Sequence, residues 1–280
     1  MWPVDDPYGL SKRFAFCEEI IESRRPAFVL DIGCGTGENL TRPLAERFPG
    51  VRFLGIDDDP ESIRQARAGV ALPNLSFGSP TSLERLHRPD LILASEVIEH
   101  VESPEQFLSY VRAHLAADGW VIVTLPNGYG PFELASLVEV LLRLSGAFAL
   151  LRWVKRFLMG SAPEGQARGT LAASPHISFF SYGQVLEIFT RSGLEVERYQ
   201  ARTLLCGFGL DALVRALGLG SWNARVADAL SPQWVSDWMF TLRRIPSREG
   251  APYRRGIITR WRRRLNERCW GTHVGSAEAS

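Results

Sequence analysis

The chain has 280 residues, of which 45% are apolar and 22% charged, and its formal net charge is +1. These proportions are those of an ordinary globular protein and exclude the disordered and fibrous classes. The near-neutral charge removes any whole-chain argument for binding nucleic acid or another polyanion. The length allows either one enlarged α/β domain or two small domains.

The cysteines are widely scattered and include no CxxC pair, so the sequence predicts neither a disulfide framework nor a zinc site. The opening residues MWPVDDPYGL are acidic and lack the apolar core of a signal peptide. The sequence contains no run of about 20 uncharged apolar residues, so we expect no membrane-spanning helix. We therefore expect a cytoplasmic protein, and leave open a contact with the inner face of the membrane.

Short apolar runs alternate with helical patterns between residues 28 and 125. This alternation predicts βαβ units and a parallel sheet, and nearly continuous apolar runs are typical of strands covered on both faces. We expect an α/β fold with a doubly wound, Rossmann-like sheet. The expected strands are 28–32, 51–57, 74–78, 90–95 and 120–125, and the expected helices are 38–48, 60–69 and 104–116.

The alternation stops after residue 125. Residues 132–158 are rich in Leu, Val and Phe and predict a helix that is buried or touches a lid or lipid, while 160–175 predict a loop. The α/β pattern then resumes with a helix at 183–191 and strands at 194–204 and 237–245. The expected organisation is an N-terminal helical cap (1–26), a sheet domain (27–246) with helical insertions (127–182 and 205–236), and a basic tail (247–280).

The first expected strand ends in the glycine-rich stretch DIGCGTG (31–37). Alternate glycines allow a sharp turn and a close approach to a ligand where a strand meets a helix. Their GxGxG spacing differs from the GxGxxG of dinucleotide-binding dehydrogenases. Asp31 precedes the first glycine by two residues; it would repel a pyrophosphate but suits a ligand that carries an ammonium group.

Asp57 follows the second expected strand directly. A carboxylate at this strand tip is placed to accept hydrogen bonds from two ribose hydroxyls. Together with the glycine loop, it predicts a ligand with a nucleoside, a cationic tail and no phosphates. S-adenosylmethionine is such a molecule.

The stretches VLDIGCGTG (29–37) and GIDDDP (55–60) resemble the first two motifs of the class I S-adenosylmethionine-dependent methyltransferases. The resemblance extends over about 28–125 and more weakly to about 245. It implies that the stretch NLSFGSP (74–80) lies at the adenine, where this sequence has Ser79 in place of the family's usual Asp. The implied donor-binding residues are Asp31, Gly33, Cys34, Gly35, Gly37, Asp57, Asp58, Ser79 and Ser95.

A second group of chemical residues follows the fourth expected strand, in SEVIEH (95–100). If this stretch enters a helix, Glu96, Glu99 and His100 lie at i, i+3 and i+4 and share one face. Two carboxylates and an imidazole can hold a divalent cation. His176, in PHISFFS (175–181), is a fourth candidate ligand.

This EVIEH pattern resembles the ubiquinone-biosynthesis O-methyltransferases, which act on catechols, and the small-RNA 3′-terminal 2′-O-methyltransferases, which act on a ribose diol. The resemblance implies a divalent cation, Mg²⁺ or Mn²⁺, held by Glu96, Glu99, His100 and His176 against two neighbouring hydroxyls. A cation lowers the pKa of a hydroxyl, and methyl transfer then needs in-line alignment with the sulfonium. The insertion at 127–175 makes the spacing to His176 longer than in the quinone enzymes.

Other roles remain open for these residues. His176 could act as a general base without a metal, with His100 and Glu96 as further catalytic candidates, or all of them could be structural. The leading hypothesis is O-methylation of a small-molecule, sugar or lipid-linked hydroxyl. The alternatives are a metal-free N-, C- or carboxyl-methyltransferase, and a non-catalytic partner that binds the donor or a membrane.

The tail carries seven arginines between residues 254 and 268. Ile258, Trp261, Leu265 and Cys269 recur at three- and four-residue steps, which predicts an amphipathic helix with a cationic face. Such a face could bind anionic lipid, RNA or a phosphorylated carrier, or simply face solvent. Because no RNA-binding module accompanies it, we expect no nucleic-acid substrate, and peripheral membrane contact through 132–158 and 254–268 is left open.

Overall fold

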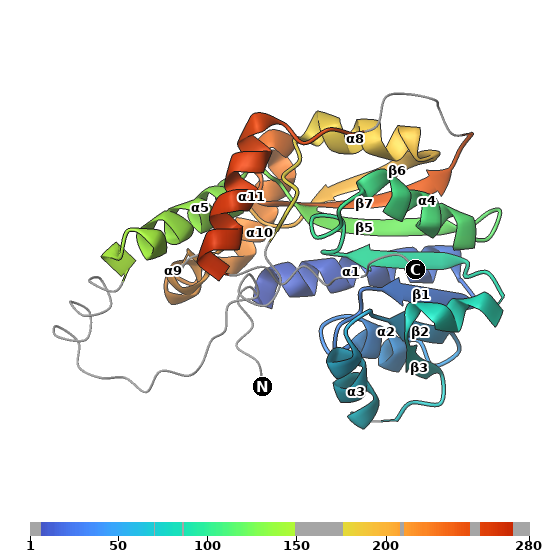
Figure 1. The fold of residues 1–280 in the computed structure, drawn as a ribbon. Coiled ribbons are helices and arrows are strands. Elements are labelled where there is room, and N and C mark those ends of the chain that lie inside the picture. Colours follow the sequence, from blue (N-terminus) through green and yellow to red (C-terminus); the bar gives the residue numbers. More distant parts are fainter. Residues whose placement is uncertain are drawn as a thin grey trace.

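The computed structural model describes residues 7–69, 71–85, 87–148, 176–207, 210–246 and 253–270. Within them, a single seven-stranded sheet forms the centre of the molecule (Figure 1). Its strands are β1 (Phe28–Ile32), β2 (Arg52–Ile56), β3 (Leu75–Gly78), β4 (Leu91–Ser95), β5 (Trp120–Pro126), β6 (Leu194–Ala201) and β7 (Asp237–Arg244).

The strand order is β3-β2-β1-β4-β5-β7-β6. The first five strands are parallel, and β7 is antiparallel to both of its neighbours. All the expected strands form, with ends that differ by at most three residues from those predicted. The prediction of a Rossmann-like α/β sheet is confirmed.

Helices cover both faces of the sheet, which is why its central strands are apolar throughout. On one face, α1 (Pro7–Arg24) and α2 (Thr41–Arg47) pack Phe16 and Leu44 against Val29 and Phe53. On the other face lie α4 (Pro104–His114) and α8 (Tyr182–Arg191). Their buried residues, Leu108, Val111, Val185, Ile188 and Phe189, join a core with residues from six of the strands.

Side-chain caps define where several of these helices begin. Asp59 accepts hydrogen bonds from two backbone N–H groups at the start of α3 (Pro60–Ala68), and Ser103 caps α4. Ser181 forms a capping box with Gln184 at the start of α8. In contrast, α2 begins at Thr41, three residues later than predicted, because the glycine loop continues to residue 40.

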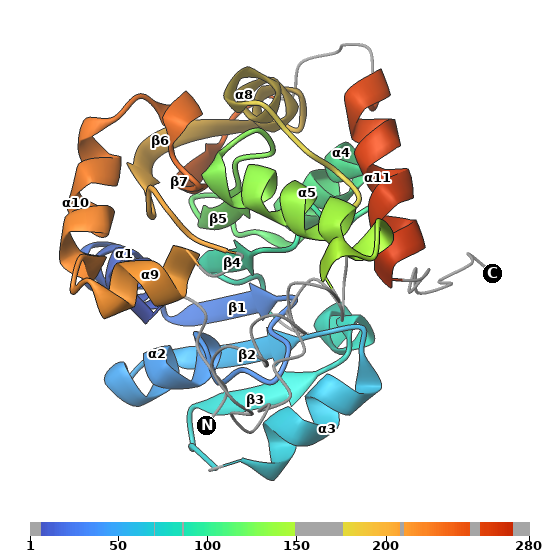
Figure 2. The ribbon, with the colours of Figure 1, turned by 90° about the vertical axis from the view of Figure 1, so that its left-hand side faces the viewer.

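The remaining described helices gather at the carboxyl end of the parallel strands. They are α5 (Pro131–Leu144), α9 (Leu210–Ala216), α10 (Gly220–Ala229) and α11 (Ile257–Trp270), with short 3₁₀ turns at Pro80–Arg85 and Pro232–Trp234. Figures 1 and 2 show α11 packed beside α5. The expected loop at 160–175, and the part of the expected helical stretch beyond residue 148, lie outside the described residues.

The tail forms a helix whose predicted apolar stripe is only partly covered, since Leu265 and Cys269 are half-buried. Thr259 and Arg262 are buried in α11, whereas Ile258 and Trp261 are 57% and 48% exposed. The inner side docks through hydrogen bonds to backbone carbonyls, such as Thr259 to Phe179. Among the described residues, no helix is both long and apolar enough to span a membrane.

Candidate functional site

The glycine loop between β1 and α2 has a backbone that requires glycine. Gly33, Gly35 and Gly37 have φ angles of 73°, 54° and 71°, in the left-handed region. A Cβ atom on Gly33 would lie 2.5 Å from Val97 Cγ2, and one on Gly37 would lie 2.5 Å from Phe77 Cζ. These contacts and φ angles show that the loop makes a tight turn at the carboxyl end of β1 that only glycine fits at these positions.

Asp31 lies on β1 just before this loop, and its side chain is buried at 3% exposure. The hydroxyl of Thr41, the first residue of α2, donates a 2.6 Å hydrogen bond to Asp31 Oδ2. Burial raises the pKa of Asp31 to about 6, although the Thr41 hydrogen bond and the nearby Arg13 act in the opposite direction.

Asp57 joins the tip of β2 to the glycine loop. Its Oδ2 accepts a 2.7 Å hydrogen bond from the N–H of Gly35, and its Oδ1 accepts a 2.9 Å bond from the N–H of Asp59. Partial burial raises the pKa of this carboxyl. The two features that predicted the donor site from separate parts of the sequence are therefore in direct contact.

The other predicted donor-binding residues surround this contact. Cys34 is half-buried in the loop, and burial raises the pKa of its thiol. Asp58 and Ser79 are exposed, and the Ser79 hydroxyl lies 2.8 Å from that of Thr81. Ser95 ends β4, where it accepts a 3.0 Å hydrogen bond from Arg13.

The stretch after β4 is a turn, so the helix that would place Glu96, Glu99 and His100 on one face does not form. Glu96 has a φ of 58°, which interrupts a right-handed helix, and the N–H of His100 bonds to the carbonyl of Val97, three residues back. The helix begins at Pro104, after the Ser103 cap. The directions of these side chains are therefore set by the turn backbone and not by helical periodicity.

The turn nevertheless brings Glu99, His100 and His176 together. One potential ligand atom from each lies within 4.8 Å of the others. The N–H groups of Ile177 and Ser178 donate 3.0 Å hydrogen bonds to the carbonyl oxygen of Glu99. These backbone bonds hold His176 at the turn despite the long insertion before it.

Glu99 is the most constrained member of this cluster. Its side chain is 1% exposed, and neither carboxylate oxygen has a hydrogen-bond partner within the described part of the chain. Burial, reinforced by the charge of Glu96, raises the pKa of Glu99 to about 8. His100 Nε2 lies 3.8 Å from Glu99 Oε1, too far for a hydrogen bond. A buried carboxyl group without such a bond gains from a closer donor or a cation.

Two residues that the sequence reasoning missed support His176 from behind. Glu133, in the first turn of α5, accepts a 2.5 Å bond from His176 Nδ1, and Arg262 of α11 lies 2.6 Å from its other oxygen. All three side chains are buried. Burial alone would lower the pKa of His176, but the charge and hydrogen bond of Glu133, together with the charges of Glu99 and Glu96, outweigh it and raise that pKa to about 9. The signal in the sequence that could have identified Glu133 was an acid at the start of an apolar stretch.

Glu96 points to a different set of partners. Its Oε1 accepts a 2.7 Å hydrogen bond from Thr124 and lies 3.3 Å from Arg202 and 3.9 Å from Arg13. Burial acts to raise the pKa of Glu96, and the two arginines more than offset it. Its predicted role as a fourth metal ligand stays a prediction.

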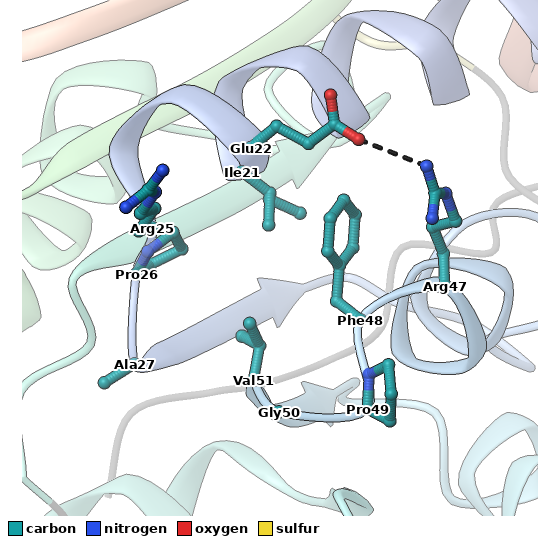
Figure 3. A pocket seen from close by; sticks show the side chains of 10 residues that line it. All are labelled: Ile21, Glu22, Arg25, Pro26, Ala27, Arg47, Phe48, Pro49, Gly50 and Val51. Atoms are coloured by element: carbon teal, nitrogen blue, oxygen red, sulfur yellow. Dashed lines mark hydrogen bonds and ion pairs between the residues drawn. The ribbon is translucent and has the colours of Figure 1, made fainter.

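A surface hollow lies at the opposite edge of the sheet, before β1 and β2 (Figure 3). It is lined by the end of α1 and the loop before β2, including Ile21, Phe48 and Val51, and is bordered by the ion pair of Glu22 and Arg47. None of the predicted site residues lines it. The hollow is therefore separate from the candidate site.

Comparison with known proteins agrees with the fold. A family model described as a methyltransferase domain matches residues 6–199, more than half of the chain. Among solved structures, magnesium protoporphyrin IX methyltransferase from Synechocystis PCC 6803, with bound S-adenosylhomocysteine, superposes with a TM-score of 0.50. It is 14% identical, and the match covers 86% of this chain and 85% of that one.

Two curated relatives match shorter segments. Trans-aconitate 2-methyltransferase of Deinococcus radiodurans is 33% identical over 112 residues, 40% of this chain and 43% of that protein. Ubiquinone biosynthesis O-methyltransferase of Bradyrhizobium diazoefficiens is 34% identical over 133 residues, 46% of this chain and 48% of that protein. The chain thus spans about half the length of the curated relatives it matches.

The sheet, the glycine loop with its strand-tip acid, and these matches define a methyltransferase fold. The chain belongs to the class I S-adenosylmethionine-dependent methyltransferases.

Proposed function

We propose that this protein transfers the methyl group of S-adenosylmethionine to a hydroxyl oxygen of a small-molecule, sugar or lipid-linked acceptor. The observation that carries the proposal is Glu99, whose buried carboxyl oxygens have no hydrogen-bond partner among the described residues and lie beside His100 and His176. This cluster lies at the carboxyl edge of the sheet, where α/β folds bind their ligands.

The donor would be held by the residues around the glycine loop. The loop at 33–37 would run alongside the methionine portion of the donor, and Asp31 would stabilise the ammonium group of that portion. Asp57, already bonded to Gly35, would turn to the ribose hydroxyls. Asp58, Ser79 and Ser95 are the nearby polar groups available to the rest of the nucleoside.

The cluster of Glu99, His100 and His176 fits a divalent cation, Mg²⁺ or Mn²⁺. Glu99 supplies oxygens that need a cationic partner, and Glu133 binds His176 Nδ1, which leaves Nε2 as the ring atom for a ligand. A carboxylate behind a ligating histidine is the common arrangement at metal sites. When bound, such a cation would lower the pKa of an acceptor hydroxyl and orient it.

The remaining steps need only alignment and a proton acceptor. As the hydroxyl oxygen forms its bond to the methyl carbon, the carbon–sulfur bond of the sulfonium breaks, and S-adenosylhomocysteine leaves. The hydroxyl proton passes to a base, for which Glu96 and His100 are candidates; His176 is a third candidate only in its deprotonated form, because its pKa is about 9. The pairing of Glu96 with Arg202 and Arg13 keeps that carboxylate ionised at neutral pH.

A second candidate is metal-free methylation of a carboxylate. It is favoured by Arg13 and Arg202, two cationic side chains that flank Glu96 near the donor loop. The relative named as a trans-aconitate methyltransferase is consistent with it. The two candidates differ in their dependence on a cation.

The donor half of the proposal is tested by calorimetric titration of S-adenosylhomocysteine. Asp57→Ala should weaken binding by about 10–100-fold, since hydrogen bonds to a charged group contribute roughly 1.5–3 kcal/mol. The control is Glu46→Ala, which removes an exposed carboxylate of α2 outside the predicted site and should change affinity far less. Absence of binding by the unaltered protein would refute the catalytic proposal altogether.

The acceptor half is tested with radiolabelled donor, catechol and sugar-diol acceptors, and a carboxylate acceptor. Transfer to a diol should stop with EDTA and return with Mg²⁺ or Mn²⁺. Glu99→Gln should lower Mn²⁺ affinity, measured by electron paramagnetic resonance, without changing S-adenosylhomocysteine affinity. Transfer that survives exhaustive chelation would instead support the metal-free candidate.

A further inference from the structure

The helix α11 packs on the protein through polar side chains and leaves part of its apolar surface exposed. Its inner residues Thr259, Arg262 and Asn266 donate hydrogen bonds to the carbonyl oxygens of Phe179, Gly128 and His176. A helix on a globular protein normally buries its apolar residues, yet Ile257, Ile258 and Trp261 are exposed here. These exposed residues indicate that the outward side has a partner of its own.

The outer face of α11 consists of Ile257, Arg260, Trp261, Arg264 and Arg268, which are spaced i, i+3, i+4, i+7 and i+11. All five are exposed, Ile257 at 78%. Helical periodicity places residues at these spacings on one side of the helix. The face is therefore a mixture of apolar and cationic side chains.

No acid neutralises this face within the described part of the chain. The one carboxylate of α11, Glu267, bonds to Arg263, and Arg263 also pairs with Glu102. No ion pair of Arg260, Arg264 or Arg268 occurs between described residues. Three positive charges thus stand beside an exposed tryptophan and isoleucine.

A second exposed apolar stripe lies on the neighbouring helix α5. Leu134, Val138 and Leu141, at i, i+4 and i+7, are each about half exposed. Figures 1 and 2 place α5, α9 and α11 at the same end of the molecule, on the left of Figure 1. Exposed apolar side chains gathered on one part of a protein surface are a feature of interaction sites.

We propose that the outer face of α11, together with the stripe on α5, docks on an anionic lipid bilayer. Such a surface offers negative charge for the arginines and an apolar layer for tryptophan and isoleucine, as amphipathic interfacial helices require. RNA would match the charge but not the apolar residues. A symmetric contact with a second copy would set the three arginines against their own equivalents.

The test is co-sedimentation of the full chain with vesicles of phosphatidylcholine, alone or mixed with phosphatidylglycerol. We expect binding to the anionic vesicles only. Binding should weaken as salt rises from about 0.1 M to about 1 M, because the Debye length falls from about 10 Å to about 3 Å. The proposal is wrong if anionic vesicles fail to bind, or if neutral vesicles bind as well.

Variants locate the surface. Arg264→Gln with Arg268→Gln should weaken vesicle binding about 30-fold, at roughly 5-fold for each basic residue at an anionic membrane. The control pair, Arg64→Gln with Arg88→Gln, removes the same charge elsewhere on the surface and should change binding at most a few-fold. Equal losses in the two pairs would show a whole-protein charge effect and overturn the assignment of the face.

A third variant tests whether the apolar residues contribute to vesicle binding, and whether a second copy of the protein or RNA binds this face instead. Ile257→Ser with Trp261→Ser should also reduce vesicle binding at constant charge. The proposal is overturned if these substitutions instead dissociate a dimer in analytical ultracentrifugation, or if they abolish binding of single-stranded RNA while vesicle binding is unchanged. Titration of S-adenosylhomocysteine into each variant should be unaltered, so a failure of membrane docking stays distinct from a failure of the methyltransferase proposal.

Discussion

Single residues of the candidate site are controlled by what surrounds them as much as by their own chemistry. Asp31 and Glu99 are both buried acids, yet Asp31 accepts a hydrogen bond from Thr41 while the oxygens of Glu99 accept none. Burial raises both pKa values, to about 6 and about 8 respectively. The smaller rise follows from the hydrogen bond and the nearby Arg13, which stabilise the ionised form of Asp31.

The pKa of Asp31 makes donor-site binding depend on pH. An ammonium group beside Asp31 favours the carboxylate, so the bound state should have a lower Asp31 pKa than the free protein. Affinity for S-adenosylhomocysteine should therefore be constant above about pH 6 and fall as the pH drops below it, with proton release on binding. Calorimetry in buffers of different ionisation enthalpy measures both effects.

The control for this linkage is Asp31→Asn, which keeps an oxygen for the Thr41 hydrogen bond but cannot ionise. We expect weaker binding and a flat pH profile between pH 5 and pH 7, roughly the range around the Asp31 transition. If the variant keeps the full pH dependence, another group is responsible for it.

At the scale of elements, α5 and α11 are joined by a charge pair between segments far apart in the sequence. Arg262 contacts both the backbone carbonyl and the carboxylate of Glu133, and Glu133 in turn binds His176. A charge is costly to bury unless it is paired, so Arg262, Glu133 and His176 each depend on their neighbour in this series of contacts. The basic tail is therefore part of the support of the site.

Arg262→Ala should consequently destabilise the protein strongly. It leaves the buried Glu133 with one partner fewer, and loss of one member of a buried ion pair costs roughly 3–5 kcal/mol. Urea unfolding followed by circular dichroism measures the change in the free energy of unfolding. The matched control is Arg260→Ala on the exposed side of the same helix, with an expected change of about 0.5 kcal/mol or less. Similar values for both variants would contradict the structural role of Arg262.

At the scale of the whole molecule, the donor site joins strands from the centre of the sheet. The loop after β1, the tip of β2 and the end of β4 meet at one edge, and the cores on both faces of the sheet hold these strands together. A ligand that binds there contacts only the folded state, so its binding free energy adds to the stability of the fold.

S-adenosylhomocysteine should therefore raise the unfolding temperature. At about 100 times its Kd, it should stabilise the protein by about 2.7 kcal/mol, which corresponds to a shift on the order of 5 °C in differential scanning fluorimetry. At the same ligand concentration, Asp57→Ala should show a much smaller shift. A full shift in that variant would remove Asp57 from the donor site.

Most of the fold and the donor loop followed from the sequence alone. Apolar runs, the spacing of Gly33, Gly35 and Gly37, and the strand-tip Asp57 are local signals, because backbone sterics and strand burial act on neighbouring residues. The caps at Asp59 and Ser103 are local in the same way and marked where two helices begin. These features required no knowledge of distant contacts.

Only the tertiary structure decided how the second cluster is assembled. It replaced the expected helix at 96–100 with a turn, separated Glu96 from Glu99, and placed Glu133 and Arg262 behind His176. It also buried the polar residues Thr259 and Arg262 of α11 and left Ile258 and Trp261, from the apolar stripe, exposed. The reason is physical: buried charges are paired by whichever elements meet in space, and sequence periodicity carries no information about contacts between residues more than a hundred positions apart.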